Sequence, residues 1–179
     1  MPVVPVSDAR PPFILAIDAG TSSVRALVFD ARGNPVAGAE AQLPYRIDTT
    51  PDGGATFDAG ALFDLTVETI DRLAETSGDV LEQVAAVGTT SFWHSLLGLD
   101  RDGEPCTPLY YWADTRSAPD ALALREELDA HAIWQRTGCR LHPSYWPAKL
   151  HWLQRTEPAL VARVDRWLSF PEFALQRLC

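Results

Sequence analysis

The sequence has little cysteine and no clustered metal ligands. Its three cysteines are widely spaced, and its four histidines show no ligand spacing. This argues against a zinc site or a disulfide framework. An odd cysteine count leaves at least one thiol unpaired in a monomer, which favours a reducing, cytoplasmic setting. These residues are Cys106, Cys139, Cys179, His94, His131, His142 and His151.

Positive charge is also in deficit. Fifteen lysine and arginine residues stand against 24 aspartate and glutamate residues, and the formal net charge is −9. A negative protein is repelled by nucleic-acid phosphates and by anionic lipid, so we expect neither nucleic acid nor a membrane as the main partner.

Residues 1–12 contain four prolines and no apolar core. They are expected to form a loose arm, because they lack the pattern of a signal peptide or a transmembrane segment.

The remaining composition is that of a globular domain. Hydrophobic residues make up 46% and charged residues 22% of the 179 positions. This balance excludes a disordered chain, and the length allows one domain with a sizeable core.

The most informative stretch is residues 13–30. An apolar run at Phe13–Ile17 has strand length, and its unbroken character predicts a strand that is buried on both faces. Asp18 ends the run, a polar loop follows at residues 19–23, and a second apolar run covers Val24–Phe29. We expect two strands folded back over a hydroxyl-rich turn, with a carboxylate at its mouth.

Such a turn suits a phosphate group bound together with a metal ion. Gly20 lets the backbone approach a ligand closely, and successive N–H groups in a turn can form an anion-binding concavity. Hydroxyl donors follow at Thr21, Ser22 and Ser23. Asp18 would repel a bare phosphate, so its presence favours Mg²⁺ between the two. The alternative is a hairpin in which these residues only make the turn.

The rest of the chain alternates strand and helix patterns, which predicts a mixed α/β fold. A third strand near residues 35–43 would complete an antiparallel meander, and the strand around residues 84–88 would be parallel and reached by a helical crossover. The other expected elements are a loop at 44–57, a helix from Asp58 to about residue 74, strands at 95–99 and 109–112, helices from Ser117 and over 143–155, a strand within 164–170 and a helix from 171.

Two of these strands deliver residues suited to a polyol. Ligands of open α/β sheets collect outside the carboxyl ends of parallel strands. An aromatic ring can cover the C–H face of a sugar, while charged groups bind its hydroxyls. The candidates are His94, Trp112, Asp114 and Arg116. The alternative is structural, with the tryptophan in the core and the aspartate and arginine as a surface ion pair.

Together these stretches resemble the FGGY family of carbohydrate kinases, which belongs to the actin/hexokinase-like superfamily. The matching segments are Asp18-x-Gly20-Thr21-x-Ser23-x-Arg25, residues 94–105, Trp-Ala-Asp-Thr-Arg at 112–116, and blocks at 137–153 and 167–173. They follow the family's order over residues 13–178 and are most similar to gluconokinases and xylulokinases. The resemblance implies a ribonuclease H-like mixed sheet with crossover helices, incomplete at the C-terminus.

The resemblance also implies site roles and cofactors. It implies that the transferred phosphate and Mg²⁺ of ATP bind at the first turn, around Asp18, Gly20, Thr21, Ser23 and Arg25, with Ser22 in the same turn. Asp18 would act through the metal or through a bound water molecule. His94, Trp112, Asp114 and Arg116 would contact or frame the sugar. The family's catalytic base lies beyond the position of Cys179, and a nucleotide domain follows it. Residues 13–179 would thus be the first part of the sugar-binding domain, and we expect them to be inactive alone.

Gluconate is the favoured substrate on the block at residues 137–149, and xylulose is the alternative. Arg116, or Lys149 at the accessible edge of the helix over 143–155, could supply the cation that the carboxylate of gluconate needs, whereas xylulose needs none. Glycerol is disfavoured. Phe92-Trp93 replaces a polar pair that is common in the family, and Ser144 stands where glycerol kinases carry a substrate-contacting tyrosine. Two further hypotheses stay open: a non-catalytic sugar-binding or regulatory module, and a structural fragment that aggregates or forms a homodimer.

Overall fold

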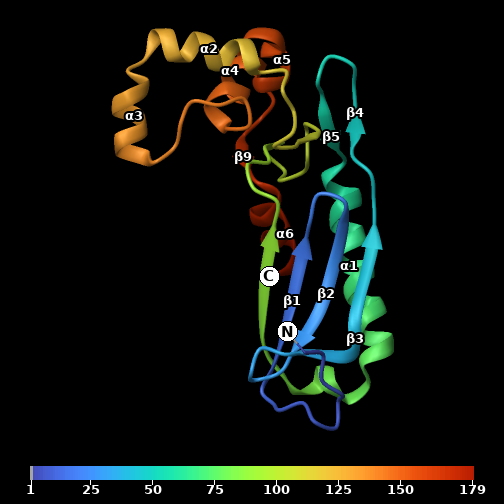
Figure 1. The fold of residues 1–179 in the computed structure, drawn as a ribbon. Coiled ribbons are helices and arrows are strands. Elements are labelled where there is room, and N and C mark those ends of the chain that lie inside the picture. The colour runs from blue at the N-terminus through green and yellow to red at the C-terminus, as the bar shows by residue number, and fades with distance from the viewer. Residues whose placement is uncertain (1) are drawn as a thin grey trace. The chain divides into compact units, whose positions relative to one another are not determined.

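The chain divides into two units in the computed structural model, which describes residues 2–179 (Figure 1). Unit 1 contains the residues up to 46 and residues 60–92, and unit 2 contains residues 47–59 and 93–179.

Unit 1 is built on a four-stranded sheet with the strand order β3-β2-β1-β6. Strand β1 is antiparallel to β2 and parallel to β6, while β2 is antiparallel to β3. The predicted meander and the parallel strand after a helical crossover are therefore confirmed. The elements are β1 (Phe13–Ala19), β2 (Ser23–Phe29), β3 (Pro35–Pro44), α1 (Ala59–Ser77), the 3₁₀ helix η1 (Gly78–Gln83) and β6 (Val84–Ser91).

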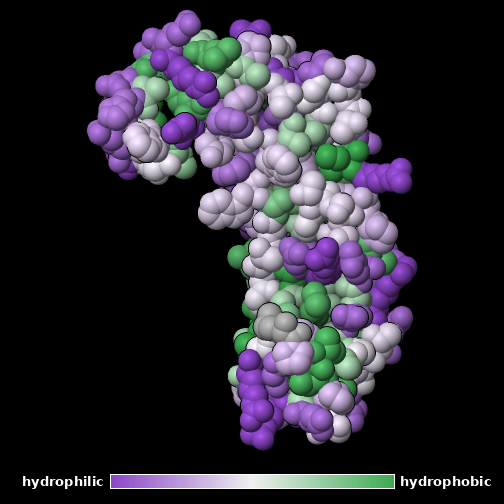
Figure 2. All heavy atoms as spheres, in the orientation of Figure 1, coloured by the Kyte–Doolittle hydropathy of each residue, from purple (hydrophilic) through white to green (hydrophobic). Residues whose placement is uncertain are grey.

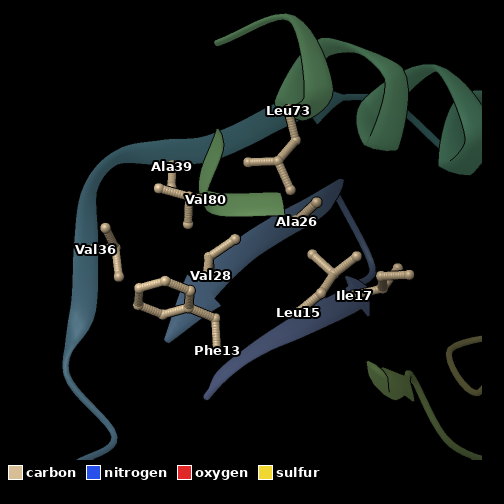
Figure 3. Packing of buried hydrophobic residues seen from close by; sticks show 9 residues of the cluster. All are labelled: Phe13, Leu15, Ile17, Ala26, Val28, Val36, Ala39, Leu73 and Val80. Carbon is tan, nitrogen blue, oxygen red and sulfur yellow. The ribbon is translucent and has the colours of Figure 1, made fainter. Parts of the chain in front are cut away.

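The core of unit 1 lies on one face of this sheet (Figure 3). Phe13, Leu15 and Ile17 of β1 are buried there and pack in one cluster with Leu73 of α1. The expectation that β1 is buried on both faces is wrong, because its burial alternates and Ile14 is 43% exposed. Successive side chains of a strand point to opposite faces, and α1 packs on only one of them.

Strand β6 forms one end of the sheet. It pairs with β1 along its length, yet residues 85–90 are all exposed. An apolar run in the sequence therefore lies at a sheet edge within the described residues. Such an edge presents unpaired backbone groups to other chains.

Unit 2 combines two small sheets with five helices among its described residues. The sheets have the orders β4-β5-β8 and β7-β9. Its elements are β4 (Asp48–Thr49), β5 (Ala55–Phe57), β7 (Leu97–Leu99), β8 (Leu109–Tyr110), α2 (Ala118–Glu127), α3 (Ala130–Thr137), α4 (Trp146–Thr156), α5 (Pro158–Val161), β9 (Arg166–Leu168) and α6 (Phe170–Leu178).

Several local expectations in unit 2 need correction. The segment expected as a loop contains β4 and β5, and α3 was not expected. Ser117 precedes α2, but its hydroxyl donates to the carbonyl oxygen of Pro143 at 2.9 Å and makes no capping hydrogen bond. The helical spacing of Ala121, Leu124 and Leu128 predicts that all three lie on the inner face of α2, yet Leu128 is 45% exposed.

The N-terminal segment contacts the edge of the sheet. Val4 forms a parallel bridge with Val36, and its N–H donates to the carbonyl oxygen of Pro35 at 2.9 Å. Within residues 2–179, we find no helix with both the length and the hydropathy needed to cross a bilayer.

Candidate functional site

The turn between β1 and β2 is held in place by hydrogen bonds from two directions. Gly20 N–H donates to the carbonyl oxygen of Ser23 at 2.9 Å, which closes the turn. Tyr45, just after β3, donates its hydroxyl to the carbonyl oxygen of Gly20 at 2.5 Å and its N–H to that of Ser22 at 3.0 Å. The turn is therefore fixed by tertiary contacts as well as by its own sequence. The role of Tyr45 was not predicted.

Gly20 is required by a close backbone approach. A Cβ at this position would lie 3.2 Å from the carbonyl oxygen of Ser23, a tight contact, and 3.9 Å from Oδ2 of Asp18. The carboxylate of Asp18 thus lies near Gly20, which itself has no side chain to fill the space beside it. Such an arrangement would allow a cation to bind between the carboxylate of Asp18 and an anionic group at the turn.

The sheet extends this polar surface across four strands. Asp18 lies opposite Arg25 of β2 on one side and Thr90 of β6 on the other. Arg25 in turn lies opposite Gln42 of β3. Paired residues of neighbouring strands share a face, so these four side chains form one row next to the turn. The sequence identified Asp18 and Arg25, but not the register that brings Gln42 and Thr90 beside them.

Ser23 is placed differently from the other turn residues. It is buried, and its Oγ accepts a hydrogen bond from Nε2 of Gln42 at 2.9 Å. Thr21 is half-buried, whereas Ser22 is exposed. Exposed Ser22 is therefore the hydroxyl of this turn that a ligand can reach most easily.

The turn presents one carboxylate, that of Asp18, to a cation. No cluster of three or more histidine, cysteine or acidic side chains able to hold a metal occurs in residues 2–179. Mg²⁺ commonly binds through one or two carboxylates together with substrate phosphates and water. Asp18 alone meets that requirement on the protein side.

In unit 2, His94 has a strained backbone and an aromatic neighbour. Its φ is 64°, in the left-handed region that residues other than glycine adopt rarely. Its ring centroid lies 4.4 Å from that of Tyr145, just before α4. Burial lowers the pKa of His94, and the charges of His142 and Lys149 lower it further. The ring is thus kept neutral near pH 7, with one nitrogen to donate and one to accept a hydrogen bond.

Two exposed indoles accompany His94 in unit 2. Trp93 is 76% exposed and Trp112 is 46% exposed. The carbonyl oxygen of Trp112 accepts a hydrogen bond from Oγ of Ser144 at 2.8 Å, which ties this segment to the start of α4. Exposed indole faces of this kind can cover the apolar side of a sugar ring or chain.

Asp114 faces inward. The residue is 1% exposed, and its carboxylate accepts hydrogen bonds from the N–H of Ala55 at 3.1 Å and from Nη2 of Arg116 at 2.6 Å. Arg116 also stacks on Trp152, with its guanidinium carbon 4.6 Å from the ring centroid. Both charges are used to join β5, the 113–116 segment and α4. This geometry suits framing a site more than touching a ligand.

Lys149 was expected at the accessible edge of a helix, and this is wrong. It is 1% exposed, and its Nζ donates to the carbonyl oxygen of Asp114 at 2.9 Å. Burial lowers its pKa to about 8, although the nearby charge of Asp114 acts in the opposite direction. The helix turns this side chain toward the 113–116 segment, a contact between residues far apart in the sequence.

Tyr145 is the functional candidate that sequence reasoning missed in this unit. The sequence showed it only as displaced by one position from the tyrosine of glycerol kinases. Its contact with His94 depends on the meeting of two segments 51 residues apart, so no local signal could have found it.

Comparison with known proteins identifies the family. The model of the FGGY family of carbohydrate kinases, N-terminal domain, matches residues 13–179. The chain belongs to the FGGY family of carbohydrate kinases. The expected ribonuclease H-like fold is confirmed as well, because solved FGGY kinases share this architecture.

Relatives and solved structures within the family differ in their substrates. The chain is 25% identical to the gluconokinase of Bacillus subtilis (strain 168), covering 93% of this chain and 32% of that kinase. It is 34% identical to the xylulose kinase of Streptomyces rubiginosus, covering 97% and 35%. Glycerol kinases match as well. The crystal structure of gluconate kinase from Lactobacillus acidophilus superimposes with a TM-score of 0.81 at 28% identity, covering 92% of this chain and 32% of that one.

The chain spans about a third of the length of the curated relatives that it matches.

Proposed function

We propose that the protein containing this chain transfers the γ-phosphoryl group of ATP to a hydroxyl group of a sugar or sugar acid. The observation that carries the proposal is the carboxylate of Asp18, whose Oδ2 lies 3.9 Å from the position that a Cβ would take at Gly20, in the turn between β1 and β2. A carbohydrate kinase needs such a place for Mg²⁺ and phosphate, since phosphoryl transfer relies on positioning and charge neutralisation.

On the phosphate side, each group has a distinct role. Asp18 would hold Mg²⁺ directly or through a water molecule, and Gly20 leaves room for the phosphoryl oxygens. Thr21 and Ser22 lie in the turn as hydroxyl donors, while Ser23 is buried and supports the turn through Gln42. Arg25, opposite Asp18, adds positive charge on the same face of the sheet. Bound Mg²⁺ and ATP would supply the charge neutralisation and the transferable phosphoryl group.

On the sugar side, His94 and the exposed indole of Trp112 would contact the substrate. The neutral imidazole of His94 can both donate a hydrogen bond to a sugar hydroxyl and accept one. Asp114 and Arg116 would frame the site, because their charges already bind each other and the backbone. The base that deprotonates the attacking hydroxyl is proposed to lie outside residues 2–179.

Gluconate remains the first candidate substrate, and xylulose is the second. Gluconate is favoured on the block at residues 137–149, and Arg116 or Lys149 is the expected source of the cation that its carboxylate needs. In the structure Arg116 binds Asp114, and Lys149 is buried against a carbonyl oxygen. If gluconate is the substrate, its carboxylate therefore needs either a shift of Arg116 or a cation from elsewhere in the protein. Xylulose needs neither.

The test is sugar-dependent ADP release by the full-length protein, measured with gluconate, xylulose and glycerol. We expect turnover with gluconate or xylulose, and an Asp18→Asn variant should lose about 100-fold in kcat because charge neutralisation at the phosphate is impaired. Asp8→Asn, at an exposed position in the N-terminal segment, is the matched control and should keep full activity.

Other outcomes would reject the proposal. Full activity of Asp18→Asn would show that the β1–β2 turn is not the phosphate site. Calorimetric binding of a sugar by a full-length protein that releases no ADP would favour the non-catalytic module.

The proposed setting is the cytoplasm, in keeping with three free cysteines.

A further inference from the structure

Unit 2 carries a groove outside the residues assigned to phosphate or sugar. It has a volume of about 420 Å³ and is formed by α2, α3 and the segment that follows α3. Figure 1 shows α2 and α3 in orange, and Figure 2 shows that this region mixes hydrophilic and hydrophobic residues at its surface. The groove is lined by Arg125, Ala130, His131, Trp134, Arg140 and Leu141.

The walls of the groove are fixed by short-range and long-range contacts. Asp129 caps α3 by accepting a hydrogen bond from the N–H of Ala132 at 2.9 Å, and Gly138 ends α3 with a φ of 72°. The chain then turns back, and Leu141 is buried in a cluster with residues of α2 and α4. Arg125 binds the carbonyl oxygen of Leu141 through Nε at 2.9 Å and Nη2 at 2.5 Å.

The chemistry of the lining is cationic and aromatic. Trp134 is 43% exposed, the guanidinium carbon of Arg140 lies 5.7 Å from the centroid of its indole, and the ring of His131 lies 5.8 Å away. None of the six lining residues is acidic, in a chain whose net charge is −9. Glu126 and Glu127 follow Arg125 in the sequence but do not line the groove. Two guanidinium groups beside an exposed indole are suited to an anion with a flat part.

We propose that this groove binds a small molecule that joins a phosphate or carboxylate group to a flat apolar part. Arg140 binds the anionic group, and the indole of Trp134 covers the flat part. Arg125, whose Nε and Nη2 donate to the carbonyl oxygen of Leu141, adds positive charge beside the anion. The proposal does not depend on the proposed kinase function, since neither Asp18 nor His94 takes part.

The groove is also connected to the sugar-site candidates along the chain. Leu141 in its wall is followed directly by His142, whose ring centroid lies 5.7 Å from that of Tyr145. Tyr145 in turn contacts His94. A ligand that fixes residues 140–141 would therefore act on a segment that reaches His94 within a few residues.

The test is calorimetric binding of phenyl phosphate, benzoate and the neutral benzyl alcohol to the full-length protein. We expect at least one of the two anions to bind, and benzyl alcohol to bind about tenfold more weakly than that anion because it lacks the charge-assisted hydrogen bonds. Whether phenyl phosphate or benzoate binds more tightly distinguishes a phosphate ligand from a carboxylate ligand.

Substitutions of single arginines show where the anion binds. Arg140→Gln should weaken the binding of the anion about tenfold. Arg136→Gln removes an exposed arginine of α3 that does not line the groove, and should change the binding less than about twofold. Arg140→Glu should abolish binding, and thermal unfolding checks that each variant is folded.

Three results would overturn the proposal. They are no detectable binding of either anion, equal losses in Arg140→Gln and Arg136→Gln, and binding of benzyl alcohol as tight as that of the tighter-binding anion. An Asp18→Asn variant that loses kinase activity but keeps anion binding would separate this site from the phosphate turn.

Discussion

Asp114 joins three segments of unit 2 that are far apart in the sequence. Its carboxylate accepts hydrogen bonds from the N–H of Ala55 in β5 and from Arg116, and its main-chain carbonyl oxygen accepts one from the ammonium group of Lys149. Because Asp114 is almost fully buried, water cannot replace these partners. Asp114, which the sequence suggests as a ligand contact, therefore also stabilises the structure of this unit.

Removal of this carboxylate should destabilise the protein. In Asp114→Ala, the N–H of Ala55 and the guanidinium of Arg116 lose a buried partner, and we expect a loss of about 3 kcal/mol in the free energy of unfolding, measured by urea denaturation. The control is Asp102→Ala, an exposed turn position, which should change it by less than about 0.5 kcal/mol. Similar stability of both variants would contradict the structural role.

Lys149 should make stability depend on pH in the alkaline range. Its pKa is lowered from 10.5 to about 8 by burial, so between these two values the unfolded chain keeps a proton that the folded chain has lost. The unfolding free energy contributed by Lys149 should therefore rise with pH from about 8 to 10.5, by on the order of 3 kcal/mol, and be constant below pH 8.

The measurement compares the protein with Lys149→Met, which has no titrating group at this position. The difference in unfolding free energy between the two proteins should be constant from pH 6 to pH 7.5. Above that range, the unfolding free energy of the protein with lysine should increase relative to that of Lys149→Met. A difference that stays constant up to pH 10 would show that the amine is not desolvated.

The environment of strand β6 differs from the one that its sequence predicts. Its apolar run would suit a buried strand, yet residues 85–90 are exposed and Val87 is 57% exposed. An exposed, apolar edge strand promotes pairing with other chains. This is the physical basis for the hypothesis of an aggregating or dimeric fragment.

A charge on β6 should reduce association of residues 1–179 expressed alone. Val87→Lys places a lysine on the edge strand, and sedimentation velocity should show less oligomer than the unaltered chain. Val3→Lys makes the same charge change at a residue that is 63% exposed in the N-terminal segment, and serves as the control. Equal effects of the two variants would assign the change to net charge and not to the edge of the sheet.

The whole chain contains the turn proposed to bind phosphate and several candidate residues for a sugar site. It spans about a third of the length of the curated relatives that it matches. Phosphoryl transfer also needs a base for the attacking hydroxyl and a site for the nucleotide. Neither has been identified among the described residues, and the family resemblance places both after residue 179.

Residues 1–179 alone should therefore give no sugar-dependent ADP release, whereas the full-length protein should turn over its substrate. A coupled assay for ADP with gluconate and xylulose compares the two proteins. Sugar-dependent turnover by the 179-residue chain would contradict this prediction and would require a base within it.

The sequence alone determined the family, the strand–turn–strand at residues 13–30 and most of the helices and strands. These features depend on local patterns: an apolar run, a glycine where the backbone comes close, and hydrophobic residues at helical spacing. The ion pair of Glu68 with Arg72, at 2.7 Å, was likewise predictable because four residues span one helical turn.

Only the tertiary structure decided which faces are buried and which charges have partners. The burial of Lys149, the inward carboxylate of Asp114, the exposed face of β1 and the contact of His94 with Tyr145 each depend on residues distant in the sequence. Spacing along the chain specifies which side chains share a face, but not what packs against that face. That choice is made when the hydrophobic surfaces of separate elements come together.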